Sequence, residues 1–92
     1  MNRAEGYALL TVELNSYRQL AHAELVELIG DETSIMRRGS DGTHYSIELW
    51  VRWYDAAAQQ VVVSGSVSPA DWGSPHDRLD DSFVVSGDSS VS

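Results

Sequence analysis

The sequence contains no cysteine, no lysine and no long hydrophobic run. The absence of cysteine excludes disulfide bonds, thiolate catalysis and cysteine-ligated zinc. The apolar stretch near the N-terminus, YALLTV, is much shorter than a membrane-spanning segment. It lies between Glu5 and Glu13, which is not the pattern of a signal peptide. We therefore expect a cytoplasmic protein that makes no contact with a membrane.

Positive charge is scarce in this chain. All 6 basic residues are arginines, against 14 acidic residues, and the formal net charge is −8. A nucleic-acid-binding surface normally carries a basic stripe, whereas the only basic cluster here is Arg37-Arg38. The charge therefore argues against nucleic acid as a partner. A negative surface keeps a small domain soluble, and it can also steer the domain towards a basic protein.

The first part of the chain has the periodicity of helices. One apolar stripe recurs at spacings of three and four residues and consists of Tyr7, Leu10, Leu14 and Tyr17. Asn2 and Glu5 have the spacing of a capping box at its start. A second, shorter helix is expected over residues 21–29, with Gly30 as its left-handed C-terminal cap. The pattern also allows one kinked helix in place of two.

From residue 32 onwards the pattern becomes alternating, which indicates strands. We expect them at residues 32–38, 43–54, 60–68 and 82–86. Asp41-Gly42 is a strong hairpin signal, and Gly65 is expected to mark a bulge or a close packing contact. The prediction is an α+β fold, with two N-terminal helices packed on one face of a four-stranded antiparallel sheet. Residues 1–86 would form this single domain and 87–92 a disordered tail, unless the tail adds a fifth strand.

Three stretches of the chain carry a resemblance to other proteins: DGTHYSIELWVRWYD, VVVSGSVSPADW and DSFVVSGDSSV. They resemble a family of small uncharacterised bacterial proteins in which two helices precede a G-T-x-Y-x-I-E strand, a W-x-D turn, a V-x-G-S strand and a final S-F hairpin. The resemblance extends from Asn2 to Val91. It implies the fold described above and no established activity. The chain departs from the pattern where Tyr54 is inserted before Asp55, and where 88–90 replace a D-G-S turn.

The long strand HYSIELWVRWYD has two different faces. Its odd positions are apolar from Tyr45 to Trp53 and are expected to face the core. Its even positions carry His44, Glu48, Trp50, Arg52 and Tyr54 along the other face, and the neighbouring strand adds Met36. Tryptophan, tyrosine and arginine are enriched in protein interfaces. Trp50, Arg52, Tyr54 and Met36 are therefore the predicted interface residues, and an ordinary solvated sheet face is the competing interpretation.

Signals for catalysis and for metal binding are weak. The histidines, His22, His44 and His76, show no metal-ligand spacing, and the acidic residues of 71–81 lack the pattern of a calcium loop. Neither GSVSP nor GDSS forms a nucleophile elbow. We expect no cofactor and no metal, and a non-enzymatic domain that pairs with itself or with a small accessory or immunity-like partner protein. The alternative is a ligand-binding or enzymatic site built from His44, Glu48 and Arg52.

Overall fold

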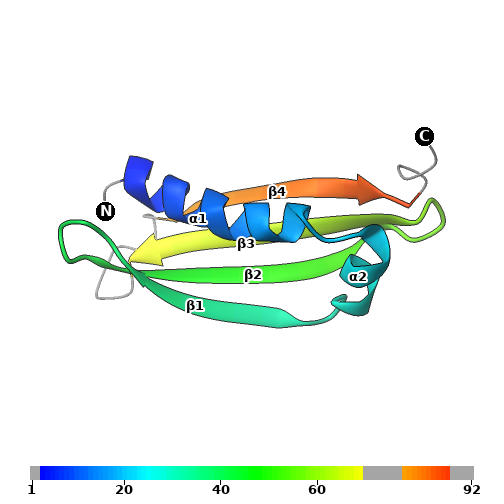
Figure 1. The fold of residues 1–92 in the computed structure, drawn as a ribbon, viewed down its shortest axis with the longest axis horizontal. Coiled ribbons are helices and arrows are strands. Elements are labelled where there is room, and N and C mark those ends of the chain that lie inside the picture. The colour runs from blue at the N-terminus through cyan, green and yellow to red at the C-terminus, as the bar shows by residue number, and fades with distance from the viewer. Residues whose placement is uncertain (1–2, 70–77, 88–92) are drawn as a thin grey trace.

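The structure, a computed structural model, describes residues 3–69 and 78–87. Within these ranges the elements follow in the order α1 (Arg3–Arg18), α2 (His22–Glu27), β1 (Glu32–Arg38), β2 (His44–Asp55), β3 (Gln60–Pro69) and β4 (Leu79–Ser86). The four strands form one antiparallel sheet in the order β1-β2-β3-β4, so each strand pairs with its neighbours in the sequence (Figure 1). The predicted α+β class and the four-stranded antiparallel sheet are confirmed.

The helices lie on the sheet at different places. α1 runs along β3 and β4, and α2 lies near the end of the sheet at which β2 finishes (Figure 1). Leu10 and Leu14 of α1 and Leu25 of α2 are buried in one cluster with side chains of β2 and β3: Tyr45, Ile47, Leu49, Val51, Val61, Val63 and Val67. α1 and α2 are separate helices, and Glu24 accepts a hydrogen bond from the backbone N of Ala21 at the start of α2.

A close approach between α1 and β3 depends on Gly65. A β-carbon at this position would lie 2.8 Å from Cδ1 of Leu10 and 2.8 Å from Cδ2 of Leu49. Both distances are well inside van der Waals contact, so the absence of a side chain allows α1 to pack onto the sheet. The close packing contact expected at Gly65 is therefore present.

The first turn of α1 is attached to the β1–β2 hairpin. The carboxylate of Glu5 accepts hydrogen bonds from Ser40 and from the hydroxyl of Tyr45. The hairpin turn has the predicted chemistry, because Gly42 has a φ of 87° and Asp41 Oδ1 accepts a hydrogen bond from the backbone N of Thr43. Asn2, the predicted cap, lies outside the described residues.

The sequence predictions for the start of β4, for Tyr7 and for Trp53 differ from the structure. β4 begins at Leu79, so Asp80 and Asp81 belong to a strand and not to the irregular segment expected there. Tyr7 was predicted to be buried, yet it is 46% exposed because its hydroxyl reaches Asp81 at the sheet edge. Trp53 was predicted to be in the core and is 39% exposed, at the end of β2 next to a register shift.

Candidate functional site

The sheet face opposite α1, which we call the open face, carries the predicted site residues. The register places alternate residues of each strand on it. Apart from its charged residues, much of this face consists of small hydroxyl side chains: Ser34, Ser46, Ser64, Ser66, Ser68, Ser82 and Ser86. A serine-rich face needs no cover from water, so the larger apolar side chains on it stand out against a polar background.

The larger side chains gather on β2, β3 and β4. Arg52 lies opposite Val62, and Val62 lies opposite Val84, so these three form one row across three strands. Trp50 occupies the next row, and the guanidinium of Arg52 lies 5.8 Å from the centroid of its ring, within cation–π range. Val84 is 44% exposed. We call Trp50, Arg52, Val62 and Val84 the open-face patch.

Tyr54 lies at the border of the open-face patch. The pairing of β2 with β3 shifts between Trp53 and Asp55, so Tyr54 is an extra residue in a β-bulge. Strict alternation, which had placed Tyr54 on the open face, therefore does not hold at this point. Its side chain is 65% exposed.

Met36 is separated from the open-face patch. It lies opposite Ser46 on the open face, whereas Trp50 lies opposite Glu32. Four residues along a strand correspond to about 13 Å, and the polar pair Ser34 and Glu48 occupies the row between them. The four predicted interface residues therefore form two groups, with Trp50, Arg52 and Tyr54 in one and Met36 on β1 in the other. Met36 is 56% exposed.

The alternative set His44, Glu48 and Arg52 does not converge. All three lie on the open face of β2, four residues apart, so successive Cα atoms are separated by about 13 Å. A general acid or base has to lie within hydrogen-bond reach of the atoms it serves. Within the described part of the chain, the structure does not bring these three side chains together around one small ligand.

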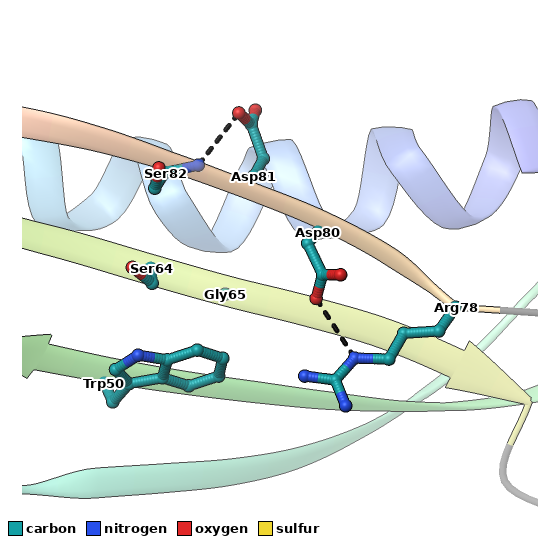
Figure 2. Close-up of a pocket in the computed structure, with 7 residues that line it drawn as sticks. All are labelled: Trp50, Ser64, Gly65, Arg78, Asp80, Asp81 and Ser82. Carbon is teal, nitrogen blue, oxygen red and sulfur yellow. Dashed lines mark hydrogen bonds and ion pairs between the residues drawn. The ribbon is translucent and has the colours of Figure 1, made fainter. Parts of the chain in front are cut away.

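Two shallow depressions flank the row that contains Trp50. One, of about 250 Å³, lies towards β1 and includes Glu32 and Glu48 in its lining. The other, of about 460 Å³, lies towards β4, where Arg78 reaches over the sheet to Asp80 (Figure 2). The ion pair between Arg78 Nε and Asp80 Oδ1 measures 3.0 Å, but both side chains are more than half exposed, so water screens it. Trp50, which is half-buried, lines both depressions.

The remaining candidates have structural roles or fall outside the described ranges. His22 Nε2 lies 2.7 Å from the carbonyl oxygen of Gln59, a non-glycine residue with a φ of 59° in the β2–β3 turn. This histidine therefore attaches α2 to a turn with an unfavourable backbone conformation. The residues of GSVSP lie in β3, while His76 and Asp71 lie outside the described part of the chain. Within that part, no group of histidine and acidic side chains could hold a metal ion.

Comparison with known proteins identifies no relative of this chain. The chain matches no family model, no curated protein and no solved structure. The resemblance to small bacterial proteins therefore remains a prediction. Neither α1 nor α2 has the length and apolarity needed to span a lipid bilayer.

Proposed function

We propose that this chain is a non-enzymatic, cytoplasmic protein-interaction domain that binds a protein partner through its open face. In this proposal both helices form the layer that covers the opposite face of the sheet. The observation that carries it is the row of Arg52, Val62 and Val84 beside the indole of Trp50 on an otherwise serine-rich face. A solvated sheet face has no need of such a row, whereas the centre of a protein interface is built from aromatic, arginine and aliphatic side chains.

The chemistry of the patch favours a protein over a small ligand. The depressions beside Trp50 are open to solvent and have charged side chains in their lining, whereas small-molecule sites are enclosed and mostly apolar. A protein partner needs only a flat surface with a few anchors, and Trp50 and Arg52 are of the type that most often serve as anchors. The partner is a different small protein or a second copy of this chain.

Site-specific photo-crosslinking in the producing cell tests this proposal. A photoreactive residue at Val84, in the open-face patch, should form an adduct of defined mass that mass spectrometry identifies. The matched control places the same residue at Val12, which is 64% exposed on α1 and far from the open face. An adduct formed from Val84 and absent from Val12 supports the proposal. The same adducts from both positions, or none from Val84, would count against a partner on the open face.

A further inference from the structure

The outer edge of β1 offers a second interaction surface, independent of the open-face patch. In the described part of the chain, β1 pairs only with β2 and is the outermost strand on its side of the sheet. Six of its seven residues are exposed, and only Ile35 is half-buried. α1 lies mainly over β3 and β4 (Figure 1), and its Glu13 forms an ion pair of 2.8 Å with Arg37 near the end of β1, on the helix side of the sheet and not at its outer edge. A second strand could therefore approach β1 without displacing the helix.

The edge lacks the usual protection in its middle. Edge strands that avoid pairing carry charges, proline or a bulge. In β1 the charged residues lie at the ends, with Glu32 at the start and Arg37-Arg38 at the finish, while 33–36 carry none. The pairing of β1 with β2 is regular throughout, without a register shift. The centre of the strand is thus suited to pair with another chain.

The sequence of β1 is complementary to itself when reversed. If two copies pair antiparallel about Ile35, Glu32 of each copy lies opposite Arg38 of the other, and Ser34 lies opposite Met36. Opposite residues in antiparallel strands share a face, so Glu32 and Arg38 of the two copies meet on the open face. Among the described residues neither side chain forms an ion pair within its own chain. We propose that this chain forms a symmetric homodimer by antiparallel pairing of β1 with β1 of a second copy, centred on Ile35.

The backbone polarity of β1 agrees with this register. The backbone N of Gly39 donates to the carbonyl oxygen of Thr43, 2.7 Å away, at the hairpin end of the β1–β2 pairing. In an antiparallel ladder, successive residues direct their N–H and C=O groups alternately to the two sides. The odd residues of β1 therefore bond to β2, while Ser34 and Met36 present their backbone groups at the outer edge. In the dimer, Ser34 of each copy exchanges backbone hydrogen bonds with Met36 of the other copy. The two Ile35 residues lie opposite each other as a close pair that makes no hydrogen bonds across the interface.

Such a dimer gives Met36 and Ile35 a role that the single chain does not. The side chain of Met36, exposed in the single chain, packs beside Ser34 of the second copy, and the half-buried Ile35 contacts its equivalent on the helix side. The two sheets become continuous, and both open faces point the same way. The inference does not rest on the open-face patch, since it uses none of the patch residues.

Charge reversal provides the first test, by light scattering and sedimentation of the full chain. Wild type should have twice the monomer mass of 10.1 kDa. Glu32→Arg alone and Arg38→Glu alone each place like charges opposite one another, so each should dimerise about tenfold more weakly or worse. An equimolar mixture of the two variants places opposite charges at both pairs and should recover the dimer. A monomeric wild type, or single variants that dimerise as wild type does, would overturn the proposal.

Cysteine crosslinking provides the second test and defines the register. The chain has no cysteine, so each engineered one is unique. At a non-hydrogen-bonded antiparallel pair the Cα atoms are about 4.5 Å apart, within the range that a disulfide spans. Ile35→Cys should therefore form a disulfide-linked dimer under mild oxidation. Thr33→Cys is the matched control, since its equivalent in the second copy lies four residues away along the strand. Equal crosslinking of both variants would rule out this register.

The open-face patch is tested separately from the dimer. The patch variant Trp50→Ser/Arg52→Ser should remain dimeric, so a failure of the dimer proposal does not affect the open-face proposal, and the reverse also holds.

Discussion

Glu5 in the first turn of α1 accepts two hydrogen bonds from Ser40 in the β1–β2 connection, one from its backbone N at 2.9 Å and one from its Oγ at 2.6 Å. The two residues are far apart in sequence, so this contact fixes the start of the helix against the hairpin. The hydrogen bonds from Ser40, followed by the one from Tyr45, lower the pKa of Glu5 because they favour the ionised carboxylate.

This contact predicts a dependence of stability on acid pH. The pKa of Glu5 is lower in the folded state than in the unfolded state. The contribution of Glu5 to the stability of the folded protein is therefore fully present above the unfolded pKa of about 4.3, and it is lost as the pH falls through the folded pKa. Glu5→Gln should unfold at lower urea concentration than wild type at pH 7, and the difference should shrink on acidification. Glu27→Gln, an exposed position on α2, is the control. A difference that is constant from pH 7 to pH 3 would contradict the role given to Glu5.

The hydroxyl of Tyr7 donates a hydrogen bond to Asp81 Oδ2, 2.9 Å away, and links α1 to β4. This hydrogen bond and the negative charge of Asp81 raise the pKa of Tyr7. The contribution of this hydrogen bond to the stability of the folded protein is present below the unfolded tyrosine pKa of about 10, and it is lost as the pH rises through the folded pKa. In a spectrophotometric titration, Asp81→Asn should lower the pKa of Tyr7, and Tyr7→Phe should remove the same late-titrating tyrosine. An unchanged titration in Asp81→Asn would show that the two side chains are not in contact.

Gly65→Ala should destabilise the domain by about 1–3 kcal/mol, because the new methyl group overpacks the contact among β3, Leu10 and Leu49. Ser64→Ala, on the same strand but on the opposite face, is the control and should change stability by no more than about 0.5 kcal/mol. Urea unfolding followed by tryptophan fluorescence measures both. Equal stability of Gly65→Ala and wild type would mean that α1 does not approach β3 at this residue.

The attachment of α2 to the core is tested at Leu25. This side chain is fully buried although α2 contains only six residues. Leu25→Ala should cost about 2–5 kcal/mol, as is usual for a buried leucine. Val12→Ala on the exposed side of α1 should have little effect. If Leu25→Ala were equally mild, α2 would not be part of the core layer.

Local patterns were sufficient to predict the sheet but not its irregularities. The alternation from Tyr45 to Val51 predicted β2 and its buried face, since this segment lies at the centre of the sheet. The same alternation failed at Tyr54, because a bulge inserts one residue without any change in side-chain pattern. The start of β4 was missed because Asp80 and Asp81 suggested a loop, although Asp81 faces α1 and has Tyr7 as a partner there.

The candidate site was predictable only in part for a related reason. Placing Trp50 and Arg52 on one face requires only the two-residue period of a strand. The row they form with Val62 and Val84, and the separation of Met36 from it, depend on the register between strands. Register is fixed by the hairpin connections and by the packing of the core, neither of which is contained in the pattern of a single strand.

The most direct measurement of the open-face proposal is a binding titration with the crosslinked partner in purified form. Wild type, Trp50→Ser/Arg52→Ser and Val12→Ser would be titrated side by side, after circular dichroism has shown that all three are folded. We expect the open-face variant to bind at least about tenfold more weakly, since loss of an interface anchor typically costs more than 1 kcal/mol, and Val12→Ser to bind as wild type does. The same dissociation constant for all three proteins would show that the open face is not the binding surface.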